Sequence, residues 1–395
     1  MAKPLPPPPV DPTRTHIVDE APFDAGSAVD ERDGGAALPP AAKPWALFWR
    51  RFRRHRLAVV SAWVLAFFYF LIVPFAEIIA PYDQETRNPD AINAPPQPLH
   101  LFHEGDYIGV FTYEMQPRID LENFQRIYTE DFSRITRVRV FCEGDPYLFW
   151  GLFEMRFHLF CPEEGGSLHL LGTDGLGRDM LSRIIHGTRV SLTIGLIGLT
   201  ISFVLGIVLG GLAGYFGGLI DNVIERLIEL IRSLPELPLW LALAAAIPAN
   251  WPPIFVYFGI TLILGLLDWP GLARAVRARV LQLREEEFVL AATLSGASPQ
   301  RLVRKHMLPN FSSHLIASAT LSVPGMILGE TALSFLGLGL RAPIVSWGVL
   351  LNDAQDLSAI EVYPWLLLPM VPVVLVVLAF NFFGDGLRDA ADPYR

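Results

Sequence analysis

The sequence predicts an all-α polytopic membrane protein with six transmembrane helices and a small β-rich or α+β insert between the first two. The chain of 395 residues is 52% hydrophobic, with a mean hydropathy of +0.37, so it is more apolar than a typical soluble protein. Its apolar residues gather in blocks that are long enough to cross a bilayer. Basic clusters adjoin two of these blocks and fix their expected direction.

The N-terminal region is expected to hold a tail and the first span. Residues 1–43 are rich in Pro, Ala, Asp and Gly without a periodic apolar pattern, which predicts a disordered cytoplasmic tail and no signal peptide. Residues 44–80 are expected to form an interfacial helix and the first transmembrane helix, kinked at Pro74. Arginines crowd before the apolar run and favour a cytoplasmic N-terminus over a nucleic-acid site. They are Arg50, Arg51, Arg53, Arg54 and Arg56.

Residues 81–168 form the expected insert. They hold 15 Asp and Glu against 7 Lys and Arg, an excess of eight acids in a chain whose net charge is −9. Short alternating runs of aromatic, Val and Arg residues are typical of strands, so we expect a small extracytoplasmic domain. Cys142 and Cys161 are the two cysteines of the chain. In an oxidising compartment they form one disulfide, and the alternative is a pair of free buried thiols.

Residues 169–395 are expected to be the transmembrane core, with five further spans and both chain termini in the cytoplasm. Small-xxx-small glycine spacings in the second span favour close helix packing. The third predicted span is broken near Pro235 and Pro238, and its first half carries Glu225, Arg226, Glu229 and Arg232 among other residues. The spans are predicted at about 190–213, 219–246, 254–281, 311–333 and 364–383.

The polar stretch 285–310 lies between two long apolar blocks. It predicts two short helices joined by a tight turn, the first running from about 286 to 295. Gly296 ends this helix in the usual C-terminal glycine position, and Ser298 with Pro299 starts the next as N-cap and first helical residue. The arginines at the inner end of the preceding span place the stretch in the cytoplasm on charge alone.

This stretch resembles the cytoplasmic coupling loop of ATP-binding cassette (ABC) importer permeases. The family pattern is Glu-Ala-Ala, three residues, Gly, nine residues, Ile, one residue and Leu-Pro. The present chain keeps these spacings, with Leu290 and His306 in place of the Glu and the Ile. The resemblance implies docking on an ATPase subunit, and the residues expected to serve that coupling are Ala291, Ala292, Gly296, Ser298, Arg301, Arg304, Lys305, Leu308 and Pro309.

A second stretch narrows the resemblance. Residues 172–179 read Gly-Thr-Asp-Gly-Leu-Gly-Arg-Asp, similar to the segment before the second span in permeases of the dipeptide, oligopeptide and nickel branch. We expect an amphipathic helix here, capped by Thr173 or Asp174 and lying on the outer membrane surface. The segment 330–337, which begins with Glu330, also resembles this branch.

Catalytic motifs are missing from the sequence. It has no phosphate-binding loop with Lys and Ser or Thr, no nucleophile with a plausible base, and no metal-ligand spacing. We therefore expect a chain that is not an enzyme and holds no cofactor or metal. Two acids lie in apolar surroundings, Asp268 and Glu330. They are candidates for the translocation path, and the alternative is hydrogen bonding within the bundle.

The resemblance implies a permease subunit in a bacterial inner membrane that forms half of a pathway for peptides or related small solutes. Its implied partners are a second homologous permease, two ATPase subunits that use ATP and Mg, an extracytoplasmic substrate-binding protein and membrane lipid, with no nucleic acid. A self-sufficient secondary transporter is the alternative, for which we see neither inverted repeats nor paired intramembrane charges. An intramembrane hydrolase would need a nucleophile and a base that the spans lack.

Overall fold

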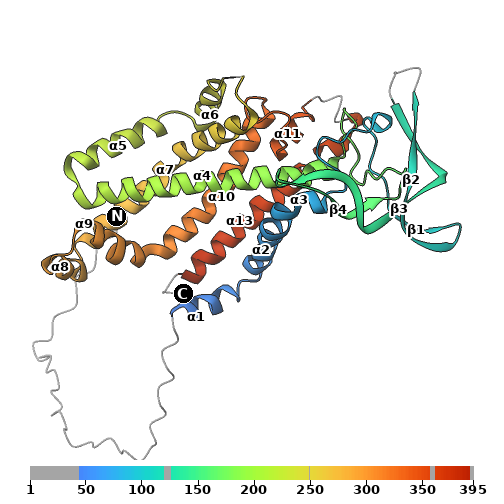
Figure 1. Cartoon of the computed structure of the whole chain (residues 1–395). Helices are drawn as coiled ribbons and strands as arrows, with labels where there is room; N and C mark the ends of the chain where they lie inside the picture. Colours follow the sequence, from blue (N-terminus) through green and yellow to red (C-terminus); the bar gives the residue numbers. More distant parts are fainter. Residues whose placement is uncertain (1–43, 120–125, 249, 356–360, 392–395) are drawn as a thin grey trace, which may run out of the picture. The chain divides into compact units, whose positions relative to one another are not determined.

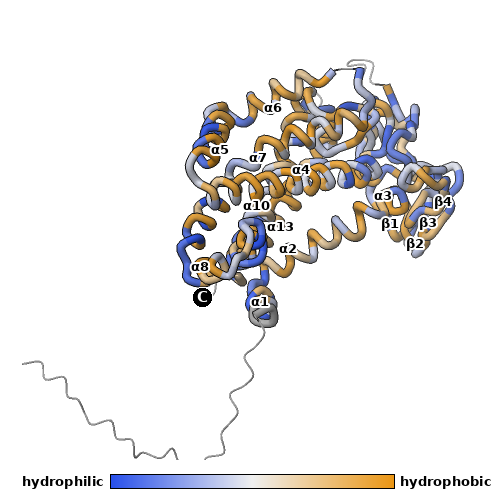
Figure 2. Tube along the Cα trace, turned by 60° about the vertical axis from the view of Figure 1, so that its left-hand side comes forward, coloured by the Kyte–Doolittle hydropathy of each residue, from blue (hydrophilic) through white to orange (hydrophobic). Residues whose placement is uncertain are grey.

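The computed structural model describes residues 44–119, 126–248, 250–355 and 361–391 (Figure 1). The predicted tail, 1–43, lies outside the described residues. Within the described part, five helical segments are long and apolar enough to cross a membrane. Hydrophobic colour runs along α2, α6 and α7, and hydrophilic colour gathers next to α8 (Figure 2). The five segments are Arg56–Ile79, Met180–Phe216, Pro253–Arg284, Pro299–Phe335 and Pro364–Ala391.

The first span is made of three consecutive helical pieces. After α1 (Pro44–Phe52), the chain forms α2 (Arg56–Ala66), the π-helical turn η1 (Phe67–Ile72) and α3 (Val73–Ile79). Phe75 has non-helical dihedral angles (φ −116°, ψ 25°), directly after Pro74. Because proline cannot donate a backbone hydrogen bond, the helix bends there, as the sequence predicts.

Four strands lie within residues 81–168. They are β1 (His100–His103), β2 (Asp106–Ile119), β3 (Arg126–Phe149) and β4 (Phe153–Pro162). Among the described residues they form one antiparallel sheet in the order β1-β2-β3-β4. Each strand pairs with the next one in the sequence, so the sheet is a meander, and the end of β4 faces the middle of β3.

Helices α4 (Met180–Phe216) and α7 (Pro253–Arg284) form the centre of the helical body. Figure 1 shows them beside α10 (Ser312–Phe335). A Cβ on Gly210 would lie 2.4 Å from the carbonyl oxygen of Ala273, so only glycine fits this crossing. The glycine spacing predicted for close packing therefore serves the contact between α4 and α7.

The segment predicted as the third span consists of two helices. α5 (Gly218–Arg232) and α6 (Glu236–Ala245) meet at Pro235, and neither is long enough to be a candidate span. Two acids of α5 bind α7, because Arg277 pairs with both Asp221 and Glu225. The division follows from proline at a position where a continuous helix would need an N–H donor.

The remaining helices close the bundle. α11 (Trp347–Asn352) follows α10, then the 3₁₀ turn η5 (Pro364–Leu367) leads into α13 (Met370–Ala391). Trp347 is fully buried in a core with Leu192 of α4 and Val376 of α13. A second cluster joins Phe52 to Leu387 and Ala390, so the end of α1 packs on the end of α13.

The start of α4 corrects one prediction. The predicted cap at Thr173 or Asp174 is wrong, because the helix that leads into the second span begins only at Met180. Its N-cap is Asp179, whose carboxylate accepts a hydrogen bond of 2.7 Å from the backbone N–H of Ser182. From there α4 runs to Phe216 without a break, so the predicted surface helix and second span are one element.

Candidate functional site

Residues 285–310, which we call the coupling segment, fold into two helical pieces around Gly296. The first is α8 (Glu287–Leu294), and the second consists of α9 (Pro299–Arg301), the π-helical turn η3 (Leu302–Met307) and the start of the 3₁₀ turn η4 (Leu308–Phe311). Gly296 has φ +79°, the left-handed conformation that favours glycine after a helix. Ser298 occupies the N-cap position, but its side chain makes no capping hydrogen bond.

One side of the coupling segment belongs to the protein core. Val289, Leu302 and Met307 are buried against Val276 and Val280 of α7. Because these side chains come from both pieces of the segment, the turn at Gly296 is held on α7 at two places. Burial of three large apolar side chains stabilises this seat by several kcal/mol, at about 1.5–3 kcal/mol for each. The coupling segment is therefore packed directly on the C-terminal half of α7.

The other side of the segment faces away from α7 and is exposed. Leu294 is 90% exposed and Leu290 is 50% exposed, and a Cβ on Gly296 would meet no atom within 4 Å. Two predicted coupling residues, Ala292 and Leu308, are half-buried against the core cluster and so face inward. The others are exposed: Ala291, Gly296, Ser298, Arg301, Arg304, Lys305 and Pro309.

Three cations stand on the second piece of the segment. Arg301, Arg304 and Lys305 are exposed, and no ion pair to any of them is found in the part of the chain that the structure describes. They lie close in sequence to the exposed leucines of α8. The exposed surface of the coupling segment therefore includes apolar side chains on α8, the acids 285–287 before it, and cations on the second piece that form no ion pair with the described residues.

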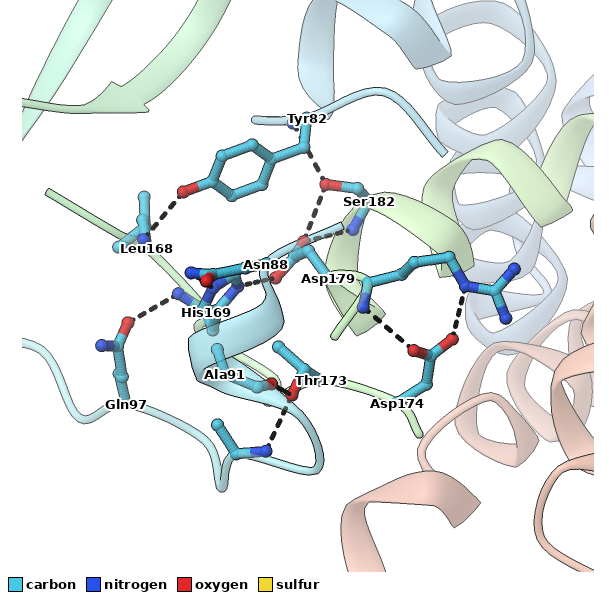
Figure 3. A network of polar contacts seen from close by, with 12 residues as sticks. Tyr82, Asn88, Ala91, Gln97, Leu168, His169, Thr173, Asp174, Asp179 and Ser182 are labelled. Atoms are coloured by element: carbon cyan, nitrogen blue, oxygen red, sulfur yellow. Dashed lines mark hydrogen bonds and ion pairs between the residues drawn. The ribbon is translucent and has the colours of Figure 1, made fainter. Parts of the chain in front are cut away.

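At the other end of α4, the Gly-Thr-Asp-Gly-Leu-Gly-Arg-Asp segment forms a buried polar network (Figure 3). Asp174 is 1% exposed and accepts hydrogen bonds from the backbone and side chain of Arg178, at 2.9 and 2.8 Å. It also pairs with Arg183 on the first turn of α4, a guanidinium that is itself buried. Asp353 contacts Arg183 at 3.4 Å. Partial burial raises the pKa of the Asp353 carboxyl, against the opposing attraction of Arg183.

The same network ties α4 to the chain that follows the first span. The backbone N–H of Tyr82 donates to Ser182 Oγ at 3.2 Å, and Tyr82 Oη accepts from the backbone N–H of Leu168 at 2.9 Å (Figure 3). Burial raises the pKa of the Tyr82 hydroxyl. His169, which the sequence left without a ligand role, is buried with its Nδ1 3.2 Å from the N-cap carboxylate of Asp179. Sequence reasoning missed the two bonds of Tyr82 because their partners lie 100 and 86 residues away in the chain.

The two acids predicted in apolar surroundings have different environments. Glu330 on α10 is fully buried and accepts hydrogen bonds from Ser191, Ser334 and Ser346 at 3.3, 2.8 and 2.6 Å. Ser191 in turn accepts from the backbone N–H of Trp347. Glu330 thus links α4, α10 and the approach to α11. For Glu330, these contacts correspond to the alternative in which the acid is hydrogen-bonded within the helical bundle.

Asp268 on α7 borders a cavity of about 570 Å³. Its carboxylate accepts a hydrogen bond of 3.0 Å from Ser202 of α4. Arg232 and Glu236, at the junction of α5 and α6, and Ser322 of α10 line the same cavity. Asp268 therefore makes a hydrogen bond within the bundle and also borders a cavity that α5, α6, α7 and α10 line. In the described residues, no group of three His, Cys, Asp or Glu side chains is placed to hold a metal ion.

Cys142 and Cys161 lie on β3 and β4. Cys142 pairs in the sheet with His158, and Cys161 pairs with Arg139. The two Cα atoms are 6.3 Å apart, within the range that a disulfide spans, and the structure joins the two sulfurs.

Comparisons with known proteins agree with this architecture. Residues 206–394 match the family described as binding-protein-dependent transport system inner membrane component, and residues 43–96 match the N-terminal TM domain of oligopeptide transport permease C. The oligopeptide transport system permease protein OppC of Escherichia coli K12 is 42% identical over 228 residues, which is 58% of this chain and 73% of that protein. OppC of Haemophilus influenzae is 42% identical over 226 residues, 57% of this chain and 70% of that protein.

The dipeptide transport system permease protein DppC of Bacillus subtilis is 42% identical over 226 residues, 57% of this chain and 68% of that protein. Among solved structures, an inward-facing conformation of the MetNI methionine ABC transporter has a TM-score of 0.42 at 20% identity, covering 54% of this chain and 98% of that chain. The sequence relatives are permease subunits of peptide transport systems, and the chain spans more than two thirds of each. This chain therefore belongs to the binding-protein-dependent transport system inner membrane component family.

Proposed function

We propose that this permease subunit lines half of a pathway for peptides and is driven by ATPase subunits that dock on the coupling segment. The observation that carries the proposal is the two-sided geometry of that segment. Its inner side is fixed on α7 through Val289 and Leu302, and its outer side presents Leu294 with cations that the described residues leave unneutralised. A force on the outer side would thus be transmitted to α7. The names of the relatives support peptides as the substrate class.

The relative direction of α4 and α7 supports six membrane crossings. Tyr257 near the start of α7 donates a hydrogen bond of 2.9 Å to Thr193 in the first half of α4, and Arg284 at the end of α7 donates one of 3.2 Å to the carbonyl of Tyr215 at the end of α4. The two helices are therefore parallel, so the chain between them must return along the bundle. α5 and α6 make this return, and we infer that together they form the sixth crossing.

The same order of helices supports a cytoplasmic N- and C-terminus. The end of α1 packs on the end of α13 through Phe52 and Leu387, so both belong to one side of the membrane. The arginine cluster 50–56 places this side in the cytoplasm by the positive-inside rule. The four-stranded sheet follows the first span, and we infer that residues 81–168 form an extracytoplasmic insert.

The implied assembly contains a second permease, two ATPases that bind ATP and Mg, and an extracytoplasmic substrate-binding protein. Reconstitution in lipid vesicles tests it. We expect labelled peptide to enter vesicles only when ATP, the ATPases and the binding protein are all present. Uptake driven by an ion gradient in vesicles that hold this chain alone would contradict the proposal and favour a secondary transporter.

We propose that Cys142 and Cys161 are bridged in the extracytoplasmic compartment. Peptide mapping by mass spectrometry without reduction should recover the two cysteines in one linked peptide. Replacing Cys142 with Ser is expected to destabilise the insert by about 3 kcal/mol, because the bond closes a loop with a sequence separation of 19. Labelling of both thiols by a maleimide before reduction would contradict the bridge.

We propose that Glu330 has a structural role, in which its hydrogen bonds hold α4 and α10 together, and that Asp268 lies on the translocation path. Glu330→Gln keeps a hydrogen-bond acceptor, so we expect near-normal uptake and thermal stability. Glu330→Leu leaves three buried serine hydroxyls without their acceptor, at about 1–3 kcal/mol for each unsatisfied group. Its melting temperature in detergent should fall clearly. Loss of uptake by the Gln variant at unchanged melting temperature would assign Glu330 to the path instead.

A further inference from the structure

The turn between β3 and β4, residues 148–153, carries an apolar surface that we call the hairpin tip. The turn is closed by two backbone hydrogen bonds of 3.0 Å, from Gly151 to Leu148 and from Leu152 to Phe149. No residue from 146 to 153 is charged. Leu148 is 59% exposed, Leu152 is 74% exposed and Phe153 is 64% exposed. Large apolar side chains gathered on one exposed turn mark a surface that contacts something else.

The hairpin tip is attached to the first span through Trp150. The indole Nε1 donates a hydrogen bond of 3.1 Å to the carbonyl of Pro74, and the backbone N–H donates one of 3.2 Å to Glu77. The guanidinium of Arg189 from α4 lies 4.3 Å from the centre of the Trp150 ring and also bonds the carbonyl of Val73 at 2.8 Å. Both carbonyls come from the residues directly before Phe75, where the helix bends.

A second attachment lies farther along β4. His158 is fully buried, and its Nδ1 lies 2.6 Å from the carbonyl oxygen of Ala80, just after α3. The hairpin is thus held at two levels of one helix, by Trp150 at Pro74 and by His158 at Ala80. These two contacts fix the direction of the hairpin relative to the first span. The tip lies beside Pro74, within the span, and the part of β4 near His158 lies beside Ala80, just after the end of the span.

This attachment sets the depth of the tip. Pro74 lies inside the candidate span Arg56–Ile79, roughly 7 Å along the helix from its end at a rise of 1.5 Å per residue. Close to it, Phe70 is 77% exposed and Phe75 is 41% exposed, as expected for side chains that face lipid. Glu77 and Arg189 form an ion pair at the same level, and because charges are costly at the hydrocarbon centre, the pair favours a position near the membrane interface.

We propose that the hairpin tip is a membrane-interface anchor, with Leu148, Leu152 and Phe153 in the headgroup and acyl boundary of the leaflet on which the sheet lies. Lipid fits this surface because no residue from 146 to 153 is charged and because Phe70 and Phe75 of the first span are exposed near Pro74. The exposed Glu154, which lies opposite Leu148 in the hairpin, marks the polar border of the tip. Tryptophan at this level is typical of the aromatic belt of membrane proteins. The inference needs only the membrane location of the chain and is independent of the ATPase-coupled mechanism.

Spin labelling tests the depth directly. A nitroxide is attached to Leu152→Cys in the full chain, with the subunits that co-purify, reconstituted in nanodiscs of phosphatidylcholine and phosphatidylglycerol. The matched control is Phe102→Cys on β1, which is 62% exposed and lies at the far edge of the sheet. Collisions with oxygen, which concentrates in lipid, are compared with collisions with a water-soluble nickel chelate.

We expect the logarithm of the ratio of oxygen to nickel accessibility to be positive at position 152 and negative at position 102. Leu148→Cys should repeat the result of Leu152→Cys and serves if that variant does not assemble. A negative value at position 152 would place the tip in water, and low accessibility to both reagents would mean that another protein covers it. Either outcome overturns the proposal.

Discussion

Gly296→Val is expected to leave the protein inserted in the membrane at its normal level while lowering peptide uptake about tenfold or more. A non-glycine residue in the left-handed conformation costs about 1–2 kcal/mol, and a tenfold change corresponds to about 1.4 kcal/mol. The φ of +79° requires that conformation. The added side chain also projects into the open space on the outward side, where the proposed ATPase contact lies. Uptake in vesicles, normalised to the amount of inserted protein, measures the effect.

Gly296→Asn is the matched control because asparagine adopts the left-handed conformation more readily than other residues. It adds bulk with little backbone strain, so its uptake should lie between that of the unchanged protein and that of the Val variant. Substitution of Gly218, which also has positive φ and open space around it but lies outside the coupling segment, should affect uptake less. Normal uptake by Gly296→Val at normal protein level would contradict the lever mechanism.

Asp174→Ala is expected to destabilise the protein by about 3–5 kcal/mol, because it leaves the buried guanidinium of Arg183 without its closest carboxylate. It also removes the acceptor for the backbone N–H groups of Leu176 and Arg178, which shape the turn before α4. The amount of folded protein in the membrane and its melting temperature in detergent measure the loss.

Asp353→Asn is the control for this prediction. Asp353 also contacts Arg183, but at 3.4 Å and with a side chain that is 41% exposed, so its removal should cost less than about 1 kcal/mol. Arg183→Met added to Asp174→Ala should recover part of the lost stability, because it removes the unpaired buried charge. If Asp174→Ala melts at the temperature of the unchanged protein, the pair does not stabilise the junction.

Local signals in the sequence account for most of the helical body. Five of the six predicted spans correspond to helices that are long enough to cross a membrane. They could be predicted because a continuous apolar run of about 20 residues matches the thickness of the hydrocarbon core of a bilayer. The helix-turn-helix form of the coupling segment could also be predicted, because Gly296 and Pro299 determine the backbone conformation of the residues next to them. Both features depend on neighbours in the sequence and little on the rest of the fold.

Features that depend on residues far apart in the chain could not be predicted from the sequence. Asp174 is a residue type that caps helices, yet its carboxylate pairs with Arg178 and with Arg183, which in turn contacts Asp353, 170 residues away. The helix begins later, at Met180. The attachment of Trp150 to Pro74 joins residues 76 positions apart. No local pattern distinguishes such a tryptophan from others on a strand. Tertiary contacts therefore decide where α4 begins and how the sheet is held.

The central claim is that ATPase subunits act on this permease through the coupling segment. A photo-crosslinking amino acid in place of Leu294, which is 90% exposed, tests it in native membranes, with the same residue in place of Leu101 on β1 as the control. We predict that position 294 crosslinks to an ATPase subunit, that the yield changes when ATP is trapped, and that position 101 gives no such product. An intact, transport-competent complex in which position 294 crosslinks to no ATPase would contradict the account.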